Sequence, residues 1–87
     1  MNAERRKKLE AIKERLTILM GEASSLGDEL AELRDEEQEY FDNMPEGLQG
    51  GDKGEKAQAA IDAMENVTGL LEDFAGIDAD ELDTAAA

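Results

Sequence analysis

The chain has 87 residues, which is enough for one small domain. It carries 23 acidic and 9 basic residues, for a formal net charge of -14, and it contains neither cysteine nor histidine. This composition excludes disulfides, thiolate or imidazole metal sites, and catalysis by a Ser-His or Cys-His pair. The charge also argues against a basic surface that binds nucleic acid or an anionic membrane.

Such an acidic chain, with few aliphatic residues, has the composition of a disordered protein, but its periodicity predicts a fold. From Leu9 onward, apolar residues recur at alternating steps of three and four, which is the heptad pattern of a coiled coil. The pattern predicts a helix over residues 3–43, and Pro45 disfavours its continuation. The predicted seam comprises Leu9, Ile12, Leu16, Leu19, Ala23, Leu26, Leu30, Leu33, Glu37, Tyr40 and Met44.

A glycine-rich stretch follows and predicts a loop over residues 44–52. A second heptad pattern predicts a helix over residues 53–75, which Asp52 and Glu55 could cap and which Gly76 ends. Residues 76–87 are predicted to form a short turn and a frayed tail. The second seam comprises Ala57, Ala60, Met64, Val67, Leu71 and Phe74.

The predicted fold class is all-α, with a long and a shorter helix in an antiparallel hairpin that forms one domain over residues 1–87. The shorter helix covers only the second half of the longer one, so an apolar stripe is expected to stay exposed on the first half. A hairpin this small needs a partner for such a stripe, and we expect a coiled-coil-like homodimer. The candidate dimer seam comprises Leu9, Ile12, Leu16, Leu19, Ala23 and Leu26.

The distribution of charge favours an antiparallel dimer. Residues 1–20 hold six bases and three acids, whereas the rest of the chain holds three bases and twenty acids. An antiparallel pair centred near residue 22 places Lys8 opposite Glu36 and Arg15 opposite Glu29. Each exposed pair contributes only tenths of a kcal/mol, roughly, but together they can select the orientation.

A row of carboxylates occupies the outer face of the first helix, with steps of three or four residues, about 5 Å along the axis. Such a row can imitate the phosphates of a nucleic-acid strand and bind a basic groove; the alternative is a solvated helix face. Tyr40 and Phe41 at the end of this helix either pack under the loop or anchor a partner. The candidate partner-binding residues are Asp28, Glu32, Asp35, Glu39, Asp42, Tyr40 and Phe41.

Acidic helices also build magnesium sites, and Asp28, Glu29 and Glu32 loosely resemble part of the pattern of all-helical nucleotide pyrophosphohydrolases. The second acidic pair, Asp62 and Glu65, has the reversed order, and no basic set for a triphosphate accompanies it. We therefore predict no enzyme activity and no catalytic, cofactor-binding or metal-binding residue. The bases at residues 5–8 are interleaved with acids and are interpreted as a helix face rather than a nucleic-acid site.

Residues 34–67, RDEEQEYFDNMPEGLQGGDKGEKAQAAIDAMENV, resemble small acidic proteins of tailed phages and prophages. In that group an acidic helix ending in DEEQEYFDNMPE precedes a short loop and a second amphipathic helix. The resemblance implies a phage origin and a helical hairpin, and it implies no catalytic residue. By analogy, small acidic phage proteins are often inhibitors of host nucleic-acid enzymes.

Two functions are consistent with these patterns. The first is a non-enzymatic acidic binding protein, a phage-encoded modulator or inhibitor that acts as a DNA mimic on a basic host protein. The alternative is a structural or assembly protein whose role is the dimeric helical bundle. The chain shows no apolar run of signal-peptide or membrane-span length, so we expect it in the cytoplasm, of the host cell if it is phage-encoded, with neither direct nucleic-acid binding nor membrane contact.

Overall fold

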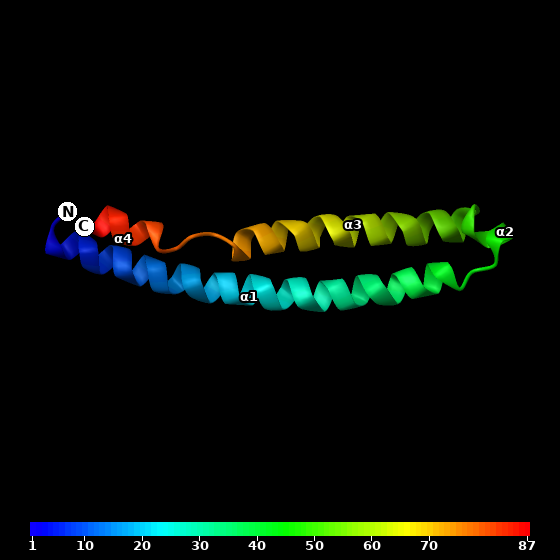
Figure 1. Ribbon diagram of the computed structural model, residues 1–87, viewed down its shortest axis with the longest axis horizontal. Helices are drawn as coiled ribbons and strands as arrows, with labels where there is room; N and C mark the ends of the chain where they lie inside the picture. Colours follow the sequence, from blue (N-terminus) through cyan, green and yellow to red (C-terminus); the bar gives the residue numbers. More distant parts are fainter.

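The computed structural model describes residues 1–87 and consists only of helices and their connections. The order along the chain is α1 (Ala3–Asp42), α2 (Glu46–Gln49), α3 (Asp52–Ala75) and α4 (Glu81–Ala86). Figure 1 shows a thin rod in which α3 and then α4 return alongside α1, and the rod measures 67 × 15 × 14 Å. The prediction of an all-helical chain with one long and one shorter main helix is confirmed.

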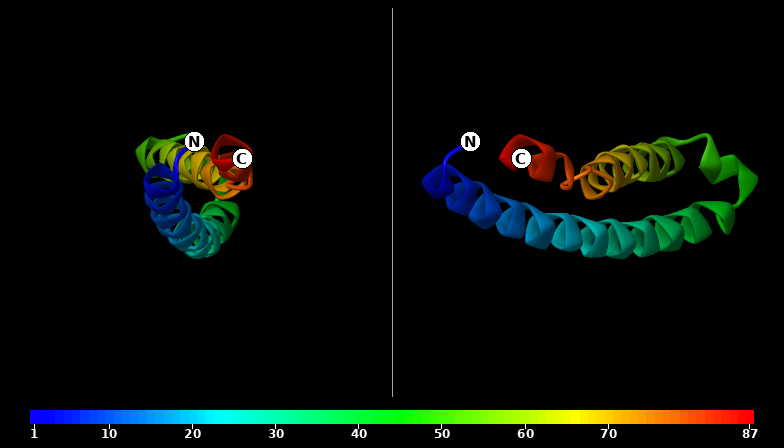
Figure 2. Two further views of the ribbon diagram at one scale, coloured as in Figure 1. Left: turned by 90° about the vertical axis from the view of Figure 1, so that its left-hand side faces the viewer. Right: turned by 60° about the vertical axis from the view of Figure 1, so that its left-hand side comes forward.

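Helix α1 begins where its sequence supplies a cap, because the Asn2 side chain accepts a hydrogen bond of 2.8 Å from the backbone N–H of Arg5. It ends at Asp42, two residues before Met44, whose helical geometry Pro45 disfavours. Figure 2 shows that α1 is bowed and that α3 and α4 both lie on its inner side. A helix that wraps around its contacts in this way is convex toward solvent.

The expected loop at residues 44–52 differs from the structure, because Glu46–Gln49 form the short helix α2. The Gln49 side chain donates to the carbonyl oxygens of Phe41 at 3.1 Å and Met44 at 3.2 Å, and so ties α2 to the end of α1. The expected capping box at Asp52 is absent: Gly51 is the N-cap of α3, and no side chain caps it.

Small residues bring α1 and α3 together. Ala23 and Gly27 are the buried residues of α1, and a Cβ added at Gly27 would lie 3.7 Å from the Leu71 Cβ on α3. On α3 the buried residues are Gly54, Ala57 and Ile61. Ile61 is the one fully buried large side chain of the chain, so the core within one copy is narrow.

Helix α3 is rotated relative to the predicted seam. Ile61 faces α1 at 1% exposure, whereas the predicted seam residues Val67 and Phe74 are 47% and 37% exposed. The reason is the small residues on both helices: they allow close approach along the side that carries Gly54, Ala57 and Ile61, and Val67 and Phe74 remain at the edge of the contact.

The N-terminal half of α1, which was expected to be uncovered, carries α4. After Gly76 the chain continues beyond α3 and forms α4 where a frayed tail was expected, and the Arg6 Nε donates to the Ala86 carbonyl oxygen at 2.8 Å. Leu9 and Leu16 are half-buried as a result. The tail reaches further than its sequence predicts, because its large apolar residues, such as Leu82, are few and give only a weak helical pattern.

Candidate functional site

The acidic row, defined as Asp28, Glu32, Asp35, Glu39 and Asp42, lies along the C-terminal half of α1, and all five side chains are exposed. Two of them have partners within the chain. Asp35 accepts a hydrogen bond of 2.9 Å from the Arg34 Nη1, and Asp42 accepts one of 2.9 Å from the Gln38 Nε2. The remaining carboxylates form no ion pair within the chain.

The two aromatic candidates at the end of α1 are separated by the fold. Tyr40 is 52% exposed, whereas Phe41 is half-buried beside the α2 corner. Tyr40 also lines a shallow groove with Pro45 and Leu48. Of the two aromatic side chains, only Tyr40 is therefore freely accessible at the surface.

A second surface is apolar and follows one heptad position along α1. We define the apolar strip as Ile12, Leu19, Leu26, Leu33 and Tyr40, which lie seven residues apart. Their exposed fractions are 52%, 55%, 46%, 54% and 52%. The candidate dimer seam is thus divided by the structure: Ala23 is buried against α3 and Leu9 and Leu16 are half-buried, while Ile12, Leu19 and Leu26 face outward.

Helix α3 extends this apolar surface. A groove between the two helices is lined by Leu26, Leu30 and Leu33 of α1 together with Val67 and Leu71 of α3. The acidic row lies elsewhere, because Asp28 follows Leu26 by two residues and so points about 160° away around the helix. The carboxylates and the apolar strip therefore occupy opposite flanks of the rod.

Charged residues border the apolar strip on the side away from α3. We define this flanking row as Lys8, Arg15, Glu22, Glu29 and Glu36, which are all exposed. Its sign changes from basic to acidic along the helix. One member has a partner within 4 Å in the chain, namely Lys8, whose Nζ lies 3.6 Å from a carboxylate oxygen of Glu4.

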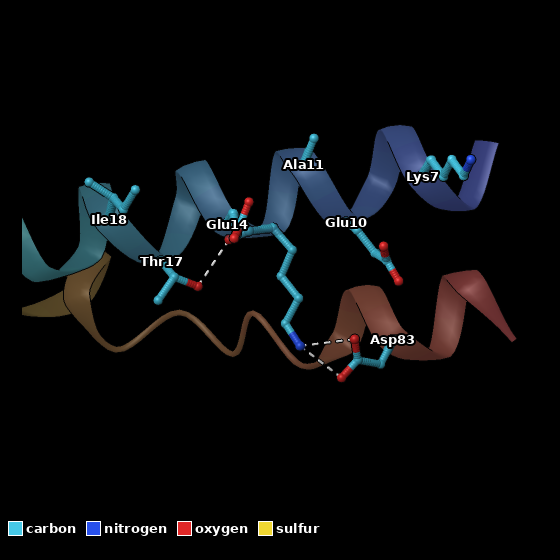
Figure 3. Close-up of a pocket in the computed structure, with 8 residues that line it drawn as sticks. Lys7, Glu10, Ala11, Glu14, Thr17, Ile18 and Asp83 are labelled. Carbon is cyan, nitrogen blue, oxygen red and sulfur yellow. Dashed lines mark hydrogen bonds and ion pairs between the residues drawn. The ribbon is translucent and has the colours of Figure 1, made fainter. Parts of the chain in front are cut away.

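The third site joins α4 to α1, as Figure 3 shows for Asp83, which faces α1 across a shallow pocket. The Lys13 Nζ donates to both carboxylate oxygens of Asp83 at 2.9 and 2.8 Å, and it lies 3.1 Å from an oxygen of Asp80. The hydrogen bond to Asp83, followed by the one to Asp80, raises the pKa of Lys13 above its ordinary value. Leu82 and Ala86 of α4 are half-buried, so this contact adds to apolar burial in holding α4 against α1.

Arg34 makes the corresponding connection between α1 and α3. Its Nε donates to the Glu65 Oε1 at 2.9 Å, and its Nη1 donates to Asp35. The hydrogen bonds to Asp35 and then to Glu65 raise the pKa of Arg34 above its ordinary value. Arg34 therefore partly neutralises the acidic row at one position.

No arrangement of catalytic type is apparent among these residues. No group of three or more carboxylates converges in a way that could hold a metal ion. Asp28, Glu29 and Glu32 are exposed on α1, and Glu65 of the second acidic pair is instead bound to Arg34.

Sequence reasoning missed the contact between Lys13 and the tail. Its signal is the pair Asp80 and Asp83, which are three residues apart at the start of a short helix and can therefore meet one lysine together. It also missed Gly54 as a packing residue, because glycine reads first as a helix-weakening residue.

No helix of the chain is both long enough and apolar enough to cross a membrane. Comparison with family models, with functionally characterised proteins and with solved structures gives no match. The function is therefore argued from the surfaces themselves.

Proposed function

We propose that the protein is a non-enzymatic acidic binding protein that presents the acidic row to a basic groove of a nucleic-acid-binding protein and so acts as a DNA mimic. The observation that carries the proposal is the exposure of all five carboxylates along one face of a single helix. Three of them, Glu32, Glu39 and Asp28, have no cation or donor of the chain beside them.

The geometry of the row supports this function. The carboxylates are spaced about 5 Å apart over roughly 20 Å of a helix, so their positions are fixed before a partner arrives. A net charge of -14 on a chain of 87 residues produces a strong negative potential, which accelerates encounter with a basic surface. Binding of this kind weakens steeply as salt is added, because charged contacts are screened.

The proposed biological setting is a phage-encoded modulator or inhibitor of a host protein in the host cytoplasm. It depends on the resemblance of residues 34–67 to phage proteins, and it remains a prediction. Within that setting the target is a protein that normally holds duplex DNA in a basic cleft. The mimic would compete with DNA for the cleft and would not itself contact nucleic acid.

The experiment compares two variants that lose the same amount of charge. The row variant carries D28N, E32Q, D35N, E39Q and D42N. The control variant carries E46Q, E55Q, D62N, E72Q and D73N, which are exposed positions on α2 and α3. Asp62 of the control accepts a hydrogen bond from Gln58, as Asp42 of the row does from Gln38, whereas the ion pair of Asp35 with Arg34 has no counterpart in the control.

The immobilised chain should capture a nucleic-acid-binding protein from bacterial lysate at low salt and release it when duplex DNA is added. The control variant should retain this capture, and the row variant should lose it. Equal capture by both variants would show that capture depends on net charge alone. It would therefore contradict the proposal that the acidic row is the binding surface. Capture that duplex DNA does not displace would also contradict the mimic.

A second candidate function is supported by a different observation. The buried hydrophobic residues number four, whereas twelve large hydrophobic side chains are exposed. This imbalance favours a structural or assembly protein whose role is a coiled-coil-like homodimeric bundle. Such a protein would need no basic target, and the row variant would then behave like the wild-type chain in every assay of assembly.

A further inference from the structure

Helix α1 has an apolar side that nothing in the chain covers. The five residues of the apolar strip are all about half exposed, and they run along almost the whole of α1. They are spaced by seven residues, which is the repeat of a surface that contacts another helix along its length. A monomer rarely leaves a contiguous apolar surface of this extent open to water.

We propose that the apolar strip is the contact surface for a second copy of this chain, which binds antiparallel with its α1 centred on Glu22. The carboxylate proposal does not depend on this assembly, because the acidic row lies on the opposite flank of α1. The occupant and its direction follow from three properties of the surface: its charge pattern, its length and its area.

The flanking row determines the direction. Its signs along α1 are basic at Lys8 and Arg15 and acidic at Glu22, Glu29 and Glu36. A parallel pair would place like charges opposite each other at every position. An antiparallel pair centred on Glu22 places Lys8 opposite the second copy's Glu36 and Arg15 opposite its Glu29, twice per dimer by symmetry.

The length of the helix agrees with that register. Residue 22 is the middle of α1, which spans Ala3–Asp42, so the two α1 helices overlap from end to end. In the same register Ile12 of one copy approaches Leu33 of the other, and Leu19 approaches Leu26. The exposed large side chains of the two strips then meet on both sides of the centre.

The available area is sufficient for a stable dimer. One long face of the rod measures 67 by 15 Å, about 1,000 Å², whereas a standard interface takes about 800 Å² from each partner. On α3, Val67 and Phe74 border the strip and extend the apolar area. The dimer would form a four-helix arrangement in which the two acidic rows lie in opposite halves.

The absence of cysteine makes the orientation directly measurable with single spin labels. Ala11→Cys and Ser25→Cys are exposed positions outside the strip. In the antiparallel dimer, two labels at residue 11 lie about 33 Å apart along the axis, and two labels at residue 25 only about 9 Å apart. A parallel dimer would bring both pairs to roughly the interaxial distance of about 10 Å.

Pulsed electron paramagnetic resonance on each labelled full-length chain should therefore give a long distance at residue 11 and a short one at residue 25. Short distances at both positions would show a parallel pair and overturn the proposal. Long distances at both would place the centre elsewhere and overturn the register. No dipolar coupling at either position would show that the strip serves a different occupant, such as a helix of another protein.

Substitution in the strip tests the surface itself. Leu19→Glu combined with Leu33→Glu should raise the dimer dissociation constant at least about a hundredfold, because each buried glutamate would lack a partner. Both positions are half exposed in one copy, so the helix content measured by circular dichroism should stay unchanged. Ile18→Glu is the matched control, since Ile18 is 70% exposed and outside the strip, and it should leave the dimer intact. An equal rise of the dimer dissociation constant in both variants would contradict the proposal that the apolar strip is the dimer contact.

Discussion

Leu19 and Ala23 lie one helical turn apart on α1, yet Ala23 is 6% exposed and Leu19 is 55% exposed. The smaller residue is inside because α3 approaches closely at Ala23 and Gly27. Leu19 is left at the surface, although large apolar side chains are usually buried at least as often as alanine. The same inversion occurs on α3, where Ala57 is buried and Val67 is exposed. The exposure of these large apolar side chains is the reason to expect that a second helix packs against the apolar strip.

The contact between Lys13 and α4 gives a first prediction. Lys13→Gln should release α4 from α1, because Asp80 and Asp83 lose their common cation. Amide hydrogen exchange at Asp83 and Ala87, whose N–H groups bond within this segment, should become fast. Lys53→Gln removes an exposed lysine without such a partner and should leave exchange in α4 unchanged. Slow exchange in both variants would show that apolar contacts alone hold α4.

The same contact should respond to pH at the alkaline end. The pKa of Lys13 is raised above its ordinary value of 10.5, so the contact contributes fully at lower pH and is lost as the pH rises through the higher value. A spin label at Ala87→Cys should be restrained at neutral pH and become mobile only when the pH passes well above the ordinary lysine value of 10.5. In the Lys13→Gln background the label should be mobile throughout. A label that loosens between neutral pH and pH 10 would contradict this origin.

The corner between α2 and α3 should tolerate no side chain at Gly54. A Cβ at this position would overlap the backbone of Gln49, which cannot move without breaking its bonds to the end of α1. Gly54→Ala should therefore lower the free energy of unfolding by about 1–3 kcal/mol in urea titration. Gly50→Ala, at the C-cap of α2, meets no atom within 4 Å and serves as the control. Unchanged stability of Gly54→Ala, or an equal loss in both variants, would refute this explanation of the corner.

Thr68 carries a buried hydroxyl that has no hydrogen-bond partner. Thr68→Val should raise the free energy of unfolding by about 1 kcal/mol, because it removes an unsatisfied polar atom from the contact between α3 and α1. Thr17→Val should give no such gain, since the Thr17 hydroxyl is exposed and donates to the Lys13 carbonyl oxygen at 2.9 Å. A destabilised Thr68→Val variant would indicate that the hydroxyl finds a partner in solution.

The long heptad pattern predicted α1 to within one residue at its end, because a repeat carried over five heptads and a following proline are strong local signals. The face that each helix buries was harder to predict. Leu19 and Val67 fit a hydrophobic pattern better than Ala23 and Gly27 do. Ala23 and Gly27 nevertheless form the contact between α1 and α3, because their short side chains allow the two backbones to approach closely.

The tail shows a second limit. Asp80 and Asp83 look like part of an acidic, solvated end until the position of Lys13 in three dimensions is known. Contacts between residues about 70 apart depend on the length and curvature of both arms, which local patterns do not encode. For the acidic row, the sequence sufficed to place Asp28 and Asp42 on the outer face, because heptad position alone decides that side of the helix.

The central claim is that a single copy leaves its main apolar surface to a second copy. Sedimentation equilibrium of the unlabelled full-length chain at micromolar concentration tests it most directly, since one copy has a mass of 9.5 kDa. The wild-type chain and Ile18→Glu should have twice that mass, and the double variant Leu19→Glu with Leu33→Glu should have a mass of 9.5 kDa. A wild-type mass of 9.5 kDa with full helix content would contradict it.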